Sequence, residues 1–160
     1  DIVYRVFSEV GMVENFDEFF DRVYDTFRNA GGWMMFPETP DVLEHLKNLG
    51  LKLGIISNFD TRIYSVLDSL GIRHFFDAIT LSSEVGFSKP DRRLFESAVR
   101  ALGVRAPSVL MVGDNPDDDV EPAMQAGLAA VLLDRSNRYA AKSHLRRISS
   151  LKELVPEVTS

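Results

Sequence analysis

The chain of 160 residues contains no cysteine, which excludes a disulfide framework, a thiolate metal site and a cysteine nucleophile. A membrane span requires about 18 consecutive apolar residues, and the sequence contains no such stretch. It also does not begin with the basic-then-apolar pattern of a signal peptide. Cationic residues are in the minority, since 18 Lys and Arg stand against 24 Asp and Glu, for a net charge of −6. A general nucleic-acid binder needs a dominant basic surface, so that class is disfavoured.

The residues that are present have the proportions of a globular protein, with 45% hydrophobic and 26% charged residues. The length suits one sizeable core and is too short for two ordinary domains. The absence of cysteine fits a reducing compartment. We therefore expect a cytoplasmic protein with neither a membrane nor a nucleic acid as its partner.

Residues 1–36 are predicted to form a helical unit. Apolar residues recur at helical spacing over residues 1–11, and Asn15 offers an N-cap oxygen with Glu18 in the capping-box position. An aromatic stripe follows over residues 16–27, which is typical of core packing and alternatively suits a surface that closes over a ligand. Trp33, Met34 and Met35 are predicted to pack the junction with the next unit, and a substrate-facing role for one of them is the alternative.

From residue 37 to residue 160 the pattern alternates between strands and helices. Strand-length apolar runs occupy residues 51–56, 78–81, 109–112 and 129–133. Helical patterns occupy residues 40–49, with Thr39 as N-cap, and residues 63–70, 90–102 and 116–126, while residues 82–89 form a loop. This alternation predicts βαβ units and a buried parallel sheet, so the fold class is α/β.

The residues that follow the predicted strands are the candidate site, because ligands bind beyond the carboxyl ends of the strands in an open parallel sheet. Ser57 and Asn58 follow one strand, Asp114 follows another, and Lys89 ends the loop between them. Ser57 can donate to a phosphoryl oxygen and Lys89 supplies a positive charge, while the Asp114 carboxylate is a hard ligand of the kind that Mg²⁺ prefers. Such a set suits a phosphoryl group bound with a divalent cation.

Five acidic residues lie close together after the third strand, and they leave the second acidic position of the site open. They are Asp114, Asp117, Asp118, Asp119 and Glu121. Asp118 and Asp119 are the two candidates for that position, and repulsion in the run calls for a metal or Lys89 to neutralise it. Each feature also has a plain structural reading: a turn at Ser57-Asn58, a solvated lysine, and acids that stabilise a helix dipole.

The ordered motifs Ser57-Asn58, Lys89-Pro90 and Gly113-Asp114 resemble those of the haloacid dehalogenase superfamily of hydrolases over about residues 31–154. The stretches 56–60, 86–91 and 148–154 look closest to the subfamily called haloacid dehalogenase-like hydrolase domain-containing protein 3. The resemblance implies a Rossmann-like core with parallel strands, preceded by part of a small helical cap in residues 1–36. It also implies hydrolysis of a small phosphorylated substrate with Mg²⁺ as cofactor.

The resemblance further implies a role for each candidate residue. Ser57 and Asn58 would orient the phosphoryl group, and Lys89 would stabilise both the nucleophile and the phosphoryl group in transfer. Asp114 would bind Mg²⁺, and Asp119 would hold Lys89 or a metal-bound water. Whether Asp118 shares the role of Asp119 is left open. The acidic run favours phosphoryl transfer over carbon–halogen displacement, which needs no metal.

One element of the family pattern is not found in the sequence. The family's nucleophile lies in an Asp-x-Asp motif at the end of an N-terminal strand, and no strand with this ending is predicted here. The resemblance implies that this strand is the central one, between the strands at Ile55 and Val109. We expect an upstream segment to supply it, so that an aspartyl-phosphate intermediate forms in the longer chain. The alternatives are an inactive binding or scaffold protein and a 2-haloacid dehalogenase.

Overall fold

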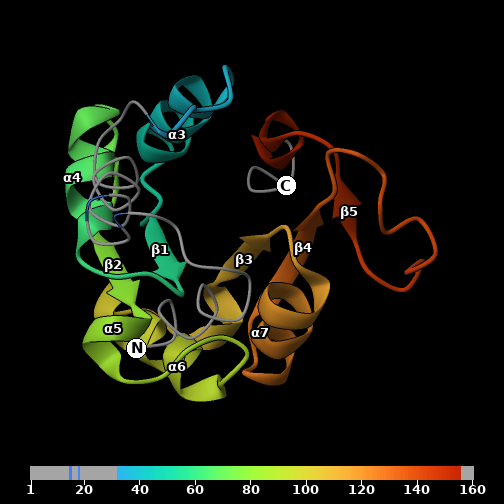
Figure 1. The fold of residues 1–160 in the computed structure, drawn as a ribbon. Coiled ribbons are helices and arrows are strands. Elements are labelled where there is room, and N and C mark those ends of the chain that lie inside the picture. Colours follow the sequence, from blue (N-terminus) through green and yellow to red (C-terminus); the bar gives the residue numbers. More distant parts are fainter. Residues whose placement is uncertain (1–14, 16–17, 19–31, 156–160) are drawn as a thin grey trace.

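The computed structural model describes Asn15, Glu18 and residues 32–155 (Figure 1). The helices expected over residues 1–11 and in the aromatic stripe lie outside the described residues, apart from Glu18, which is helical. Within the described part, none of the helices combines the length and the apolar character needed to cross a bilayer.

Two parallel sheets form the centre of the described structure (Figure 1). In the first sheet β1 (Gly54–Ser57) pairs with β2 (Ala78–Leu81). In the second, β4 (Ala129–Leu133) lies between β3 (Leu110–Gly113) and β5 (Arg147–Ile148). The prediction of an α/β fold with parallel strands is confirmed.

The four predicted helical regions lie between the strands in the predicted order, and α5 is an additional helix. The α-helices are α3 (Thr39–Asn48), α4 (Arg62–Ser69), α5 (Ser82–Val85), α6 (Arg92–Leu102) and α7 (Glu121–Gln125). Three short 3₁₀ helices are η2 (Arg73–Phe75), η3 (Ala106–Ser108) and η5 (Leu151–Leu154), and η4 (Pro116–Val120) is a short π-helix.

Several predicted boundaries are wrong, and local chemistry explains them. Glu38, not Thr39, is the N-cap of α3, and its carboxylate binds Arg135 at 2.6 Å. The helix predicted from Pro90 begins at Arg92, because the Asp91 side chain caps it by accepting from a backbone N–H. The predicted loop after β2 contains the short helix α5. Strand β5 was not predicted, since its two residues are too short for a periodic pattern.

Helix α6 joins the two sheets through one buried aromatic ring. Phe95 is fully buried and forms a cluster with Ala123 of α7. Ile56 of β1 and Met111 of β3 pack against this same cluster. Apolar burial on one side of the strands therefore couples the first sheet to the second.

The strands nearest to each other in the two sheets, β1 and β3, are less buried than their outer neighbours (Figure 1). No residue of β1 or β3 is fully buried, whereas β2 and β4 each contain two that are. In a parallel sheet covered by helices, inner strands are normally buried on both faces. β1 pairs only with β2, and β3 only with β4, so each leaves one edge unpaired in the described structure.

Replacement of Phe95 by alanine should destabilise the protein by about 3–5 kcal/mol, because it opens a cavity at the point where both sheets meet α6. Urea denaturation monitored by circular dichroism measures this change. Phe36, which is 53% exposed, provides the matched control, and its alanine variant should change stability far less. Equal effects of the two variants would contradict the role assigned to Phe95.

Candidate active site

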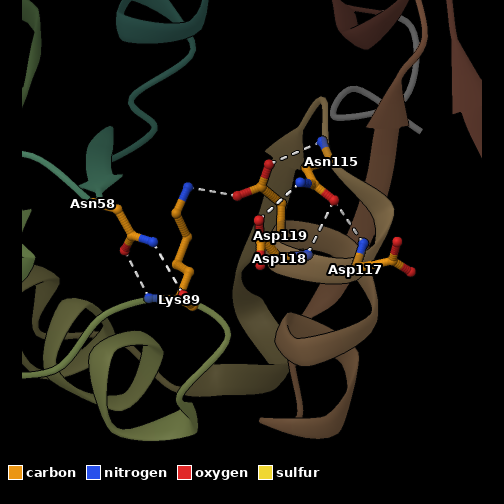
Figure 2. A network of polar contacts seen from close by, with 6 residues as sticks. All are labelled: Asn58, Lys89, Asn115, Asp117, Asp118 and Asp119. Atoms are coloured by element: carbon orange, nitrogen blue, oxygen red, sulfur yellow. Dashed lines mark hydrogen bonds and ion pairs between the residues drawn. The ribbon is translucent and has the colours of Figure 1, made fainter. Parts of the chain in front are cut away.

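An ion pair between Lys89 and Asp119 connects the loop before α6 to the turn after β3 (Figure 2). The Lys89 Nζ lies 2.6 Å from Asp119 Oδ1, and the two side chains are only 15% and 5% exposed. Burial removes both charges from water, so each charge depends on the other for compensation. The ammonium is therefore held at the carboxyl ends of the strands, where the sequence predicts the site.

Asn58 holds the main chain of the same lysine. Its Nδ2 donates to the Lys89 carbonyl oxygen at 3.0 Å, and its Oδ1 accepts from the Lys89 backbone N–H at 2.7 Å. Asn58 follows the last residue of β1, so the clamp ties the end of the first sheet to the loop that carries Lys89. Figure 2 shows the amide directed at the Lys89 backbone.

Asn115 organises the acidic run after β3. Its Oδ1 accepts from the backbone N–H groups of Asp117 and Asp118, which caps the turn η4. Its Nδ2 donates to Asp118 Oδ2 at 2.8 Å, and its backbone N–H donates to Asp119 Oδ2 at 3.0 Å. Asn115 thus sets the direction of both carboxylates that the sequence left as alternatives (Figure 2).

Gly113 provides the space in which Asp119 lies. A Cβ atom at Gly113 would overlap the Cβ and the carboxylate of Asp119. The last residue of β3 must consequently lack a side chain if Asp119 is to reach Lys89.

Lys142 neutralises the outer part of the acidic run. Its ammonium lies 2.7 Å from Asp117 and 3.0 Å from Glu121, and these two carboxylates raise the pKa of Lys142. His144 Nε2 lies 3.6 Å from the same Glu121. Lys142 and His144, two basic residues near the end of the chain, therefore lie against the outer acids of the motif.

Ser57 and Asp114 occupy the positions expected from the sequence, at the carboxyl ends of their strands. Ser57 is the last residue of β1, and the exposed Asp114 follows the last residue of β3. A cavity of about 350 Å³ opens beside Asp114 and is lined by residues at the ends of β3 and β4. A wider depression of about 470 Å³ lies at the start of β2 and contains none of the motif residues.

Asp114 and Asp118 are the two residues that the sequence offers as candidate ligands of a cation. No group of three or more His, Cys, Asp or Glu side chains suited to a metal occurs among them. Mg²⁺ commonly takes only one or two carboxylates and completes its shell with water and substrate phosphate. Asp114 and Asp118 fit this smaller set, because Asp119 already binds Lys89 and Asp117 binds Lys142.

The segment before α3 contacts the loops of both sheets. Trp33 packs edge-on against Phe59, which lies just after β1, with ring centroids 5.8 Å apart. The Arg135 guanidinium lies over the Phe36 ring, with its Cζ atom 3.6 Å from the ring centroid. Arg135 lies just after the end of β4. The Arg135 Nε and Nη2 atoms are buried and find no hydrogen-bond partner among the described residues. Met34 is 94% exposed, so its predicted packing role is wrong.

Two residues of the site were not identified from the sequence as organising groups. Asn115 carries a signal, since an asparagine before proline at a helix start is a typical N-cap. Lys142 carries none, because its partners lie 25 and 21 residues away along the chain. Only the folded chain brings it to the acidic run.

Comparison with known proteins gives one family and several relatives. A family model described as haloacid dehalogenase-like hydrolase matches residues 9–127. Glyceraldehyde 3-phosphate phosphatase of Methanothermobacter thermautotrophicus is 38% identical over 131 residues, which cover 75% of this chain and 58% of the relative. Haloacid dehalogenase-like hydrolase domain-containing protein 3 of Danio rerio is 33% identical over 129 residues, which cover 81% of this chain and 52% of the relative.

Solved structures lead to the same group. A haloacid dehalogenase-type phosphatase from Thermococcus onnurineus superposes with a TM-score of 0.74 at 28% identity, covering 78% of this chain and 58% of that one. A 2-haloacid dehalogenase from Pseudomonas syringae pv. Tomato superposes with a TM-score of 0.67 at 32% identity, and the match covers 79% of this chain and 53% of that one. The chain thus spans little more than half the length of each of these two relatives and two solved structures.

Substitution of Gly113 by alanine should displace the Asp119 carboxylate and break its bond to Lys89. Overpacking of this kind costs about 1–3 kcal/mol, which urea denaturation measures. Gly54→Ala is the matched control, because a Cβ there meets only the flexible Leu102 side chain at 3.1 Å. A Gly113→Ala crystal structure that retains the ion pair, with stability equal to that of Gly54→Ala, would contradict this expectation.

Proposed function

Because the chain belongs to the haloacid dehalogenase-like hydrolases, we propose that it carries the phosphate-binding part of a Mg²⁺-dependent phosphatase for small phosphorylated metabolites. The observation that carries this proposal is the buried Lys89 ammonium, fixed between the ends of two parallel sheets by Asp119 and Asn58. A dianionic phosphoryl group is the ligand that such a cation at a strand-end site suits best. The phosphatase named among the relatives supports this choice.

The chain's own residues divide the work on the phosphoryl group. The Ser57 hydroxyl donates a hydrogen bond to a non-bridging oxygen, since it ends β1 beside the Lys89 clamp. The Lys89 ammonium stabilises the negative charge that develops on the phosphoryl oxygens in the transition state. Asp119 keeps this ammonium in place and compensates its charge before substrate binds.

Asp114 and Asp118 would hold Mg²⁺ through carboxylate oxygens. When bound, the cation supplies charge neutralisation for the phosphoryl group. Asn115 orients Asp118 by donating to its Oδ2, and the exposed Asp114 lies at the cavity next to β3. Lys142 keeps the outer acids paired, so that they do not compete for the cation.

We further propose that the full-length protein places an additional strand between β1 and β3, ending in an Asp-x-Asp motif. The unpaired edges of β1 and β3 and their incomplete burial support this placement. Backbone N–H and C=O groups on such edges are costly to leave without partners. The first aspartate of the motif would attack phosphorus and form an aspartyl-phosphate while the P–O bond to the alcohol breaks. The second would give a proton to the leaving alcohol oxygen and then take one from the water that hydrolyses the aspartyl-phosphate to free phosphate.

Hydrogen exchange tests the additional strand. In a chain extended at its N-terminus, backbone amides on the unpaired edges of β1 and β3 should exchange at least about tenfold more slowly than in the 160-residue chain. Amides of β4 are the internal control, because this strand is already paired on both sides. Unchanged exchange in β1 and β3 would show that no strand enters between them.

Activity on p-nitrophenyl phosphate in the extended protein tests the proposed function. Asp114→Asn should lower the Mg²⁺-dependent kcat by at least about 10- to 100-fold, because loss of a group that only orients a metal ligand already costs that much. Asp117→Asn is the matched control in the same acidic run; this carboxylate is 73% exposed and paired with Lys142, so its loss should change kcat by no more than about twofold. Full Mg²⁺-dependent turnover of Asp114→Asn would overturn the metal assignment.

Two further measurements on the extended protein test the two other functions. Binding of phosphate or Mg²⁺ without hydrolysis by the extended wild-type protein would indicate a binding or scaffold protein. Release of halide from a 2-haloacid in the presence of a chelator would indicate a dehalogenase, a function named for one of the similar structures.

A further inference from the structure

We infer that Asn58 is a positioning residue that holds the Lys89 main chain, and that its side chain makes no contact with the phosphoryl group. This inference rests on the proposed function, since Lys89 is the group that would act on phosphate. It replaces the substrate-binding role that the family resemblance suggests for Asn58.

The two hydrogen bonds of the clamp are short and complementary. Asn58 donates through Nδ2 to the Lys89 carbonyl at 3.0 Å and accepts through Oδ1 from the Lys89 N–H at 2.7 Å. Only an amide side chain offers a donor and an acceptor side by side that match the N–H and C=O of one residue. An ionised aspartate could only accept, and a serine is too short to reach both groups.

Other contacts between the same two loops are longer. The Phe59 carbonyl accepts from the Ser82 hydroxyl at 3.3 Å and from the Ser83 backbone N–H at 3.4 Å. These bonds are made by the first two residues of α5, several residues before Lys89 along the chain. Asn58 is therefore the described contact that sets where the Lys89 backbone lies relative to the end of β1.

Both ends of the lysine are consequently fixed by different sheets. Asn58, after β1, holds the backbone, and Asp119, after β3, holds the ammonium (Figure 2). Lysine has a flexible four-carbon stem, so a fixed ammonium position requires that its starting point is fixed as well. Displacement of a catalytic group by about 1 Å can cost on the order of 100-fold in rate.

Steady-state kinetics with p-nitrophenyl phosphate in the extended protein test this role. Asn58→Ala should lower kcat by about 10- to 100-fold and leave KM within about threefold, because the lysine that acts on the transition state is misplaced while the Ser57 and metal contacts to the bound phosphate remain. Asn58→Asp has the same shape and keeps the acceptor oxygen, so it guards against loss of folding. Its kcat should lie between those of the wild type and Asn58→Ala, again with little change in KM. Asn48→Ala, at an exposed position of α3, is the control and should match the wild type.

The outcomes separate the inference from the proposed function. A new carboxylate in contact with a phosphate dianion would raise KM by an order of magnitude or more, so such a rise in Asn58→Asp would overturn the inference. Amide exchange gives a readout without activity: the Lys89 N–H should exchange faster in Asn58→Ala than in the wild type. Unchanged protection of that amide would likewise overturn the clamp. A wild-type protein that does not hydrolyse phosphate esters would instead overturn the proposed function and leave the amide result as the test of the clamp.

Discussion

The arrangement of the site depends on one buried ion pair, between Lys89 and Asp119. Lys89 follows the sheet of β1 and β2, and Asp119 follows β3 of the other sheet. The ion pair therefore connects the two halves of the described structure, each built on one sheet. Breaking such a pair on one side leaves an uncompensated charge away from water, which is strongly unfavourable. Much of the surrounding sequence serves to keep the two groups together: Gly113 leaves room for Asp119, Asn115 orients it, and Asn58 holds the lysine.

The same division into halves explains the unusual burial of the sheets. Helix α6 covers one face of both through Phe95, yet β1 and β3 contain no fully buried residue. In most parallel sheets the inner strands are the most buried. The described chain therefore has the features of two sheet fragments held together by a helix on one side and by polar contacts at the strand ends.

The acidic run after β3 illustrates how the fold gives different tasks to chemically similar residues. Asp119 is buried against Lys89, Asp118 accepts from Asn115, and Asp117 lies outside, paired with Lys142. Repulsion among the five acids is thus reduced by two lysines from distant parts of the chain. Asp114 is exposed like Asp117, and its position directly after the last residue of β3 distinguishes it from its neighbours.

The sequence by itself determined the strand and helix order and placed Ser57, Asn58, Lys89 and Asp114 at strand ends, because apolar periodicity and capping residues act over a few neighbours. It did not determine β5, the cap at Glu38 or the partners of Lys142, since these depend on contacts between residues tens of positions apart. The same limit applies to Asn58. A Ser-Asn pair after a strand is compatible with substrate binding, and only the tertiary structure brings the Lys89 backbone within reach of the amide and so decides which hydrogen bonds it makes.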